Sequence, residues 1–238
     1  MNKKNINNEI WAIIPARGGS KSIPKKNIAP LGGKPLISYS ISSLIESDQF
    51  DKIIVTSDSK EILKCAQDMG VDTYLRKEES DSNDFSMPDL PVISFLNSIS
   101  EEKLPKFCFM IQCTSPFIKK DTWKLACSSL LENQDMTVFA AFESHFFIWE
   151  GDKPFLNKPV NPVNHPFHMR LGRQYLEKTQ FTETGAFYGF KTKNFISSKH
   201  RFFTKALPIA TNNEENIDID TFQDLDYAEF FLNSGVEI

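Results

Sequence analysis

The chain has 238 residues, of which 40% are hydrophobic, and this is sufficient for one large domain with a buried core. Its formal net charge of -4 does not favour binding to nucleic acid or to an anionic membrane surface, because both attract basic proteins. The polar start MNKKNINNE lacks the apolar core of a secretory signal, and no apolar run has the length of a membrane span, so we expect a cytoplasmic protein.

Strands and helices alternate through the first 140 residues. Apolar runs predict buried strands at 10–16, 53–55, 71–75, 107–111 and 136–142. Apolar residues at helical spacing predict helices between them, at 35–45, from the expected capping pair Asp58 and Glu61 to Gly70, at 91–99 and at 122–131. Such alternation is typical of an α/β fold with a doubly wound, mostly parallel sheet.

The alternation stops after Phe142. Residues 143–184 are rich in Pro, Asn, His and aromatic residues without a clear period, which favours an arm or lid. Strands are expected again at 185–190, 207–211 and 217–219, and a last helix near Thr221 with Phe222, Leu225, Ala228 and Leu232 facing inward. We therefore expect a single domain over residues 1–238 with a projecting arm at about 143–184.

The segment PARGGSKSIPKKN at residues 15–27 follows the first predicted strand and combines two glycines with clustered cations. Gly18 and Gly19 would let backbone N–H groups approach an anion, Arg17 could grip phosphate oxygens in bidentate fashion, and Lys21 supplies a mobile charge. The pattern is neither a Walker loop nor the dinucleotide-binding fingerprint. It predicts a phosphate-binding loop of another kind, with an ordinary glycine turn and solvated lysines as the alternative.

Two aspartates lie near the C-terminus in the segment IDIDT, residues 217–221. On a strand, Asp218 and Asp220 would project from the same face and could share a divalent cation, and Mg²⁺ is the natural candidate beside a triphosphate. The alternative is that Asp220 caps the last helix, because Asp followed by Thr221 and Asp224 is a common helix start.

Four motifs in this order resemble the acylneuraminate cytidylyltransferases, a family that includes the synthetases for CMP-sialic and CMP-legionaminic acids. The motifs are PARGGSKSIPKKN at 15–27, IQCTSPF at 111–117, Arg173-Gln174 followed by TGAFY at 184–188, and IDIDT at 217–221. Thr184 replaces the family's usual asparagine, and Ile118 replaces a common arginine. The resemblance covers the chain from Ile10 to about Phe230 and implies a Rossmann-like nucleotidyltransferase fold.

The resemblance implies a site for CTP and a nine-carbon 2-keto sugar acid. Its positions around the nucleotide phosphates match Arg17, Lys21 and Lys26, and Asn27 matches a position that helps hold the nucleotide. The loop residues Gly18, Gly19 and Ser20 complete the predicted nucleotide site. Cytidine contacts fall on Arg76 and Ser86, and contacts to the acidic sugar on Gln112, Arg173 and Tyr188. Catalytic roles fall on Arg17, Lys21 and Asp220, and Mg²⁺ would bind Asp218 and Asp220. The alternatives are a solvated polar loop around Arg76 and Ser86, and a core position for Tyr188.

The implied reaction is in-line attack by the anomeric hydroxyl of the sugar acid on the α-phosphorus of CTP, with release of pyrophosphate and no covalent enzyme intermediate. Two other activities stay open: a synthetase for CMP-KDO, an eight-carbon acid, and a metal-dependent glycosyltransferase that uses the D-x-D at 218–220. The resemblance also implies a homodimer in which the 143–184 arm completes the partner's sugar pocket. Which nonulosonic acid is the substrate does not follow from the sequence.

Overall fold

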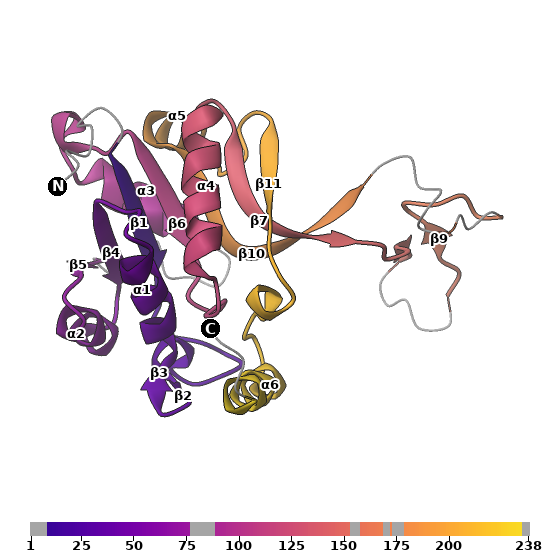
Figure 1. Ribbon diagram of the computed structural model, residues 1–238, viewed down its shortest axis with the longest axis horizontal. Helices are drawn as coiled ribbons and strands as arrows, with labels where there is room; N and C mark the ends of the chain where they lie inside the picture. Colours follow the sequence, from indigo (N-terminus) through magenta and orange to yellow (C-terminus); the bar gives the residue numbers. More distant parts are fainter. Residues whose placement is uncertain (1–8, 77–88, 153–157, 169–171, 173–178, 235–238) are drawn as a thin grey trace. The chain divides into compact units, whose positions relative to one another are not determined.

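The computed structural model describes residues 9–76, 89–152, 158–168, 172 and 179–234. The chain forms two compact units, one of residues Met1–Phe142 with Glu183–Ile238 and one of residues Glu143–Thr182. The larger unit contains a seven-stranded sheet with helices on both faces (Figure 1). No helix within the described ranges is both long enough and apolar enough to cross a membrane.

The sheet has the strand order β11-β7-β10-β6-β1-β4-β5. The strands are β1 Ile10–Pro15, β4 Lys52–Ser57, β5 Asp72–Leu75, β6 Phe107–Ile111, β7 Thr137–Ser144, β10 Gln180–Lys191 and β11 Ala206–Ala210. β1 pairs in parallel with β4 and β6, as β4 does with β5 and β11 with β7. In the same sheet, β10 pairs with β6 in the antiparallel direction. The mostly parallel sheet that the sequence predicts is confirmed.

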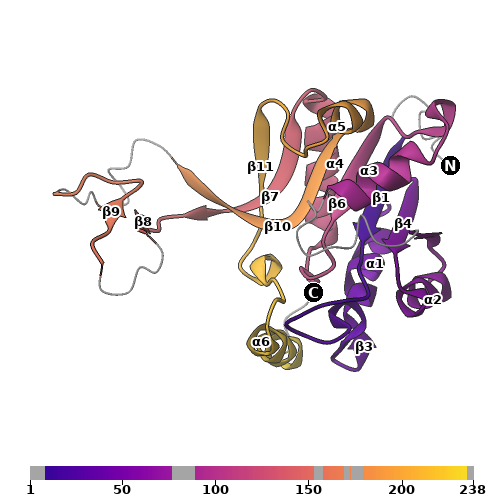
Figure 2. The same ribbon diagram turned by 180° about the vertical axis from the view of Figure 1, so that it is seen from behind.

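Both faces of the sheet are covered, which explains why β1 and β6 are apolar at every position. The helices are α1 Leu36–Ser47, α2 Lys60–Asp68 and α4 Lys120–Glu132 on one face (Figure 1), and α3 Leu90–Asn97 and α5 Thr192–Ser198 on the other (Figure 2). In β1, Ala12 and Ile14 pack toward the first group, and Trp11 and Ile13 toward the second. The chain therefore leaves β1 for β4 on one side and later enters β6 on the other, which opens a crevice at the carboxyl ends of these strands.

The start of α2 differs from the sequence-based expectation. Ser59 is the N-cap, and its Oγ accepts a hydrogen bond from the Ile62 N–H at 3.5 Å. Asp58, which we expected to cap this helix, makes different contacts that are described below. The helix ends at Asp68 with Met69 as its C-cap, and Gly70 follows with φ of +79°, a backbone conformation in which glycine avoids the steric cost of a Cβ atom.

The last helix, α6 Phe222–Asn233, begins with a reciprocal capping box. The Thr221 Oγ1 accepts a hydrogen bond from the Asp224 N–H at 3.3 Å, and the Asp224 carboxylate accepts one from the Thr221 N–H at 2.7 Å. The interpretation of Asp220 as the cap is therefore wrong. Phe222, expected to face inward, is 57% exposed, whereas Ala228 is buried beside Leu225 and Leu232.

Residues 217–219 do not form the strand that the sequence analysis predicts. A short 3-10 helix at Glu214–Asn216, η5, leads into residues 217–220, which have no regular secondary structure. Ile217 and Ile219 are buried in a third apolar cluster with α6, and the Ile219 N–H donates to the Thr114 carbonyl at 2.8 Å. The alternating isoleucines therefore reflect anchoring of an irregular segment and not pairing in the sheet.

Short elements complete the larger unit. They are η2 Lys26–Ile28, η3 Glu101–Lys103 and a hairpin of β2 Pro30–Leu31 with β3 Lys34–Pro35. Pro35, predicted as the first helical residue, is the N-cap of α1. The hairpin packs on α6, where the Gly32 N–H donates to Glu229 Oε1 at 2.8 Å. This contact ties the C-terminal helix to the segment that follows β1.

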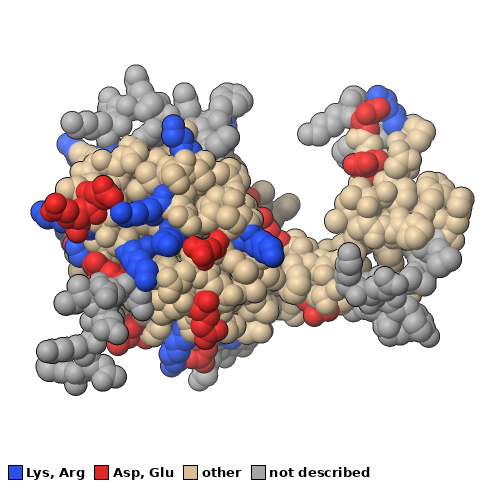
Figure 3. Space-filling model, turned by 90° about the horizontal axis from the view of Figure 1, so that it is seen from above, with Lys and Arg blue, Asp and Glu red and all other residues tan. Residues whose placement is uncertain are grey.

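Charged side chains of both signs lie together on the face of the larger unit that Figure 3 shows. The chain contains 27 basic and 31 acidic residues. Because basic groups have acidic neighbours, the overall charge does not attract a polyanion. An anionic ligand must be held by a local arrangement of cations.

The smaller unit, residues Glu143–Thr182, has its own two-stranded sheet of β8 Trp149–Glu150 and β9 Asn161–Pro162. Asn164 connects its backbone: Nδ2 donates to the Phe146 carbonyl at 2.7 Å, and Oδ1 accepts from the Ile148 N–H at 2.8 Å. Several apolar side chains of its described residues are exposed, among them Phe146, Phe147, Ile148, Trp149, Val163 and Phe167.

Candidate active site

The candidate site lies where β1, β4 and β6 end. The loop after β1 begins at Ala16, which is buried and whose N–H donates to the Thr56 carbonyl of β4 at 2.9 Å. Arg17 and Lys21 are exposed on this loop. The cations that the sequence analysis singled out therefore stand at the carboxyl edge of the sheet, where open α/β sheets bind their ligands.

Asp58, the residue after β4, holds this loop in place. Its Oδ1 accepts a hydrogen bond from the Gly18 N–H at 2.7 Å. A Cβ atom on Gly18 would lie 2.9 Å from the Cβ of Ser59, so this position has no room for a side chain. From the sequence, we expected the Gly18 N–H to face an anion. The structure instead uses that N–H inside the protein, and Gly18 serves as a close-packed anchor.

Asn27 fastens the other end of the loop. Its Nδ2 donates to the Arg17 carbonyl at 2.8 Å, and its Oδ1 accepts a hydrogen bond from the Cys113 thiol at 3.2 Å. Burial raises the pKa of Cys113 to about 12, so the thiol keeps its proton and can donate it. Asn27 thus connects the loop to the segment after β6, in addition to any contact with a nucleotide.

The adjacent lysines at 25 and 26 point to different partners. Lys25 has φ of +52° and its ammonium forms an exposed ion pair with Glu61 at 2.7 Å. The Lys26 ammonium lies 2.8 Å from Asp220 Oδ1. The side chain of Lys26 is only 14% exposed, whereas that of Asp220 is 72% exposed. The left-handed turn at Lys25 therefore separates a surface lysine from one that joins the loop to the aspartate pair.

Glu215 positions the segment at residues 217–220, which carries the two aspartates. It is fully buried, and its carboxylate accepts hydrogen bonds from the Lys119 N–H at 2.9 Å, the Thr122 hydroxyl at 2.5 Å and the Asn212 N–H at 2.8 Å. Because an anion at the amino end of a helix is stabilised by the unpaired N–H groups and the dipole, Glu215 anchors η5 to α4. The two aspartates follow three and five residues later.

Asp218 and Asp220 act on each other electrostatically, although they do not lie on a strand. Burial raises the pKa of Asp218, and the charge of Asp220 raises it further. Hydrogen bonds from Thr114 and Ser115 and the charge of Lys26 oppose this shift, and Ser115 Oγ lies 3.5 Å from Asp218 Oδ1. A partly buried carboxylate beside a second one is an environment that a divalent cation would stabilise.

The T-S-P motif and the TGAFY motif meet across the pairing of β6 with β10. The Gln112 N–H donates to the Ala186 carbonyl at 2.9 Å, and a Cβ atom on Gly185 would lie 3.6 Å from Gln112 Oε1. Gly185 has φ of +84°. Thr184 donates to the Ala140 carbonyl at 3.3 Å, so the threonine at the family's asparagine position contacts β7.

Tyr188 occupies a core position. It is 2% exposed, and the Arg201 guanidinium lies 4.3 Å from the centroid of its ring. The Tyr188 hydroxyl donates a hydrogen bond to the Glu183 carboxylate. Burial raises the pKa of Tyr188, so the phenol stays protonated. Arg201 in turn pairs with the buried Asp89 at 2.9 Å. These contacts fit the alternative that Tyr188 is a core aromatic.

Arg76 is not part of a solvated loop, which corrects one alternative of the sequence analysis. It is 5% exposed, donates from Nη2 to the Ala16 carbonyl at 3.4 Å, and pairs with Asp58 at 3.6 Å.

Three other predicted residues, Ser86, Arg173 and Gln174, lie outside the described residues. Sequence reasoning missed Asp58 and Glu215 as supports, because their partners are distant in the chain.

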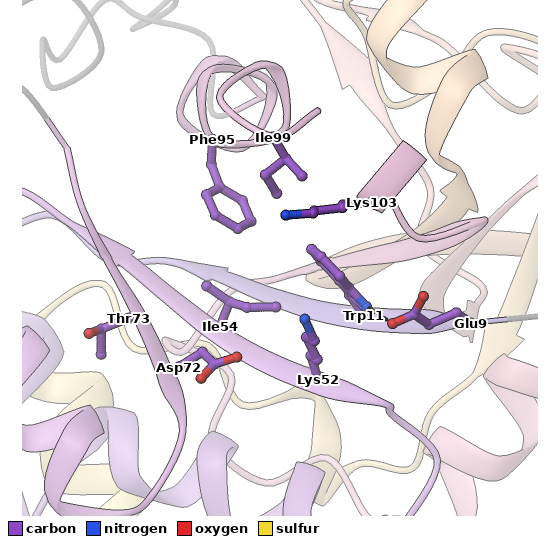
Figure 4. Close-up of a pocket in the computed structure, with 9 residues that line it drawn as sticks. All are labelled: Glu9, Trp11, Lys52, Ile54, Asp72, Thr73, Phe95, Ile99 and Lys103. Carbon is purple, nitrogen blue, oxygen red and sulfur yellow. Dashed lines mark hydrogen bonds between the residues drawn. The ribbon is translucent and has the colours of Figure 1, made fainter. Parts of the chain in front are cut away.

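A separate pocket of about 540 Å³ opens at the opposite ends of the strands (Figure 4). Its lining includes Glu9 before β1, Lys52 at the start of β4 and Asp72 at the start of β5. The ammonium of Lys52 lies 4.5 Å from the centre of the Trp11 ring and already occupies its face. The pocket shares no residue with the carboxyl-edge cluster and is not part of the candidate active site.

Comparison with known proteins supports the family resemblance that the sequence motifs indicate. A family model described as cytidylyltransferase matches residues 11–229. Pseudaminic acid cytidylyltransferase of Campylobacter jejuni subsp. jejuni serotype O:2 is 31% identical over 231 residues, 94% of this chain and 97% of that protein. CMP-N,N'-diacetyllegionaminic acid synthase of Legionella pneumophila is 29% identical over 214 residues, 89% of this chain and 91% of that protein.

Among solved structures, CMP:2-keto-3-deoxy-manno-octonic acid synthetase complexed with CTP superposes with a TM-score of 0.69. The match covers 96% of this chain and 100% of that chain at 12% sequence identity, which supports the shared fold alone. The matched family model and the full-length relatives extend this likeness from fold to enzyme class. The chain belongs to the cytidylyltransferase family and is a nucleotidyltransferase.

Proposed function

We propose that the protein transfers CMP from CTP to a nonulosonic acid, a nine-carbon 2-keto sugar acid, and releases pyrophosphate. The observation that carries the proposal is the contact of Lys26 with Asp220, which joins the cationic loop after β1 to the aspartate pair. A nucleotide triphosphate and a divalent cation need these two groups side by side. The names of the relatives from Campylobacter and Legionella supply the class of acceptor.

Catalysis in this proposal depends on positioning and on charge. The anomeric hydroxyl attacks the α-phosphorus in line with the departing pyrophosphate, so no side chain has to form a covalent bond. Arg17 and Lys21, exposed on the loop, would hold the phosphates, and Lys26 would balance negative charge that develops on the leaving group. Asn27 keeps the Arg17 backbone fixed through its 2.8 Å hydrogen bond.

Mg²⁺ is the cation that we propose for the acidic residues of the site. Asp218 and Asp220 offer carboxylate oxygens, and the raised pKa of Asp218 marks a place where added positive charge is favourable. We assign the cation to this pair, where it would offset phosphate charge and polarise the reacting phosphoryl group. Thr114 and Ser115 would keep Asp218 oriented through their hydroxyl groups.

The acceptor would bind next to Gln112, whose side chain lies over Gly185. Arg173, assigned to the acceptor carboxylate by its place in the family motif, lies outside the described residues. Pseudaminic acid is the first acceptor to test, because the relative named for it aligns over 97% of its own length. Legionaminic and N-acetylneuraminic acids follow, since small substituents decide between them and pockets discriminate these weakly.

Two other functions have less support. A CMP-KDO synthetase resembles the chain in fold at 12% identity, whereas relatives named for nine-carbon acids align at about 30%. A glycosyltransferase would use the D-x-D at 218–220, but this segment follows β11 at the end of the sheet and contacts the loop after β1. A glycosyltransferase does not account for the cationic loop beside the aspartate pair. A CMP-KDO synthetase would account for both, so the choice against it rests on the names of the relatives.

The smaller unit is proposed to mediate a homodimer. Within it, Phe147 and Trp149 pack edge-on against His165 at ring distances of 4.9 and 5.0 Å, while Phe146, Ile148 and Phe167 remain largely exposed. So many exposed apolar groups in a small unit are typical of a protein interface. One chain has a mass of 27.2 kDa, and we expect light scattering to give twice this value. A monomer at working concentration would exclude this role.

The function is tested by incubating the purified protein with Mg²⁺, each nucleoside triphosphate in turn and a panel of 2-keto sugar acids. Pyrophosphate release and the mass of the product are measured. We expect a CMP-sugar from CTP with at least one nine-carbon acid and little product from the other nucleotides. Turnover with KDO alone, or transfer from a ready-made nucleotide sugar without pyrophosphate release, would contradict the proposal.

A further inference from the structure

Asp58 lies between two parts of the site that the family resemblance assigns to the triphosphate and to the cytidine of CTP. On one side, its Oδ1 accepts the Gly18 N–H at 2.7 Å and so fixes the loop that carries Arg17 and Lys21. On the other side, the same oxygen lies 3.6 Å from Nη2 of Arg76. One carboxylate therefore contacts both the phosphate loop and the arginine assigned to the cytidine.

The surroundings make Asp58 a rigid connection. Arg76 is buried, its N–H donates to the Ser57 carbonyl at 2.9 Å, and its Nη2 donates to the Ala16 carbonyl. Gly18 is pressed against Ser59, where even a methyl group would not fit. A hydrogen bond that involves an ionised group in such partly buried surroundings is stronger and shorter than a neutral one. The two contacts thus set the distance between loop and arginine.

We propose that Asp58 is a positioning residue that couples the triphosphate loop to the base-reading Arg76 and so contributes to the choice of CTP over other pyrimidine nucleotides. The inference rests on the proposed function. Asp58 touches no substrate in this scheme. It acts by fixing the distance between Arg76 and the loop after β1. A nucleotide is then accepted only if the edge of its base contacts Arg76 while its triphosphate is bound by the loop.

Two substitutions separate the contributions of Asp58. Asp58→Asn keeps an oxygen that can accept the Gly18 N–H and removes only the charge that faces Arg76, whereas Asp58→Ala removes both contacts. Asp121→Asn is the matched control, because Asp121 is exposed on α4 and pairs with Lys124 at 2.9 Å. CTP and UTP are compared in each protein by calorimetric binding and by kcat/KM, with thermal unfolding as the check on folding.

We expect Asp58→Asn to lower the ratio of kcat/KM for CTP to that for UTP by about tenfold, a change typical of losing one charge-assisted contact. Asp58→Ala should lower the ratio at least as much and also raise the KM for both nucleotides. Asp121→Asn should match the wild type. A merely structural role would reduce the use of both nucleotides equally and leave their ratio unchanged.

The possible failures are distinguishable. Folded Asp58 variants with the wild-type ratio of CTP to UTP would overturn the coupling and leave the proposed function intact. Wild-type protein that neither binds nor uses CTP would overturn the proposed function and this inference with it. If Asp58→Ala does not fold, the near-isosteric Asp58→Asn carries the test alone.

Discussion

Replacing Asp220 with asparagine is expected to lower kcat/KM for pyrophosphate release by about a thousandfold while leaving the fold unchanged. Asparagine keeps the shape of the side chain but removes the charge that, in our proposal, holds the divalent cation beside the triphosphate. The side chain also loses the ion pair with Lys26 at 2.8 Å, whose aspartate end is exposed. Pyrophosphate release at saturating Mg²⁺ measures the loss.

The fold should tolerate this change because the start of α6 does not depend on the Asp220 side chain. The capping box is formed by Thr221 and Asp224, and Asp220 contributes only its backbone N–H, which donates to Asp224 at 3.0 Å. Asp226→Asn is the control, since Asp226 is an exposed aspartate of the same helix. Activity above a tenth of wild type in Asp220→Asn would exclude Asp220 as an essential residue.

The parts of the fold that sequence reasoning predicted well are those decided by local pattern. β6 has the predicted bounds, Phe107–Ile111, because a buried parallel strand is apolar at every position and is bounded by polar residues. The loop at 15–27 was expected to carry cations at the end of β1, and Arg17 and Lys21 are exposed there. A strand followed by glycines and lysines is a local signal, so the place of the cations could be predicted from the sequence, while their role in binding phosphate stays a prediction.

The parts that failed depend on partners far along the chain. Ile217 and Ile219 alternate with aspartates as in a strand, yet a strand needs a neighbour for its backbone ladder. The Ile219 N–H donates to the Thr114 carbonyl, but the Ile217 N–H turns back to the nearby Glu214 carbonyl at 3.5 Å, and the segment stays irregular. No sequence pattern indicates whether such a neighbour exists.

Asp58 shows the same limit for the candidate site. Aspartate before a helix is a common N-cap, and the adjacent Ser59 satisfies the same pattern. Gly18, forty positions earlier, decides which of the two residues caps α2. Its N–H donates a hydrogen bond to the Asp58 carboxylate and so leaves Ser59 as the cap. A residue that sequence reasoning assigned to local structure is thereby available to organise the site.

Replacing Lys26 with methionine is expected to change two affinities in opposite directions. Lys26 forms an ion pair with Asp220 at 2.8 Å, and its charge opposes the rise in the pKa of Asp218, so the ammonium acts as a cation beside this pair. Removing its charge should tighten binding of Mn²⁺, used as a probe for Mg²⁺, by about tenfold. The KM for CTP should rise by about 10- to 100-fold, because a charged contact to the phosphates is lost.

The opposite signs distinguish this role from simple damage, since a misfolded loop would weaken the binding of both ligands. Mn²⁺ binding is measured by electron paramagnetic resonance without nucleotide, and the KM for CTP by pyrophosphate release. Lys25→Met is the matched control, because Lys25 is adjacent in sequence but pairs with Glu61 in an exposed contact. If Lys26→Met weakened Mn²⁺ binding, or if Lys25→Met reproduced both changes, Lys26 would not be the residue that balances the aspartate pair before the nucleotide arrives.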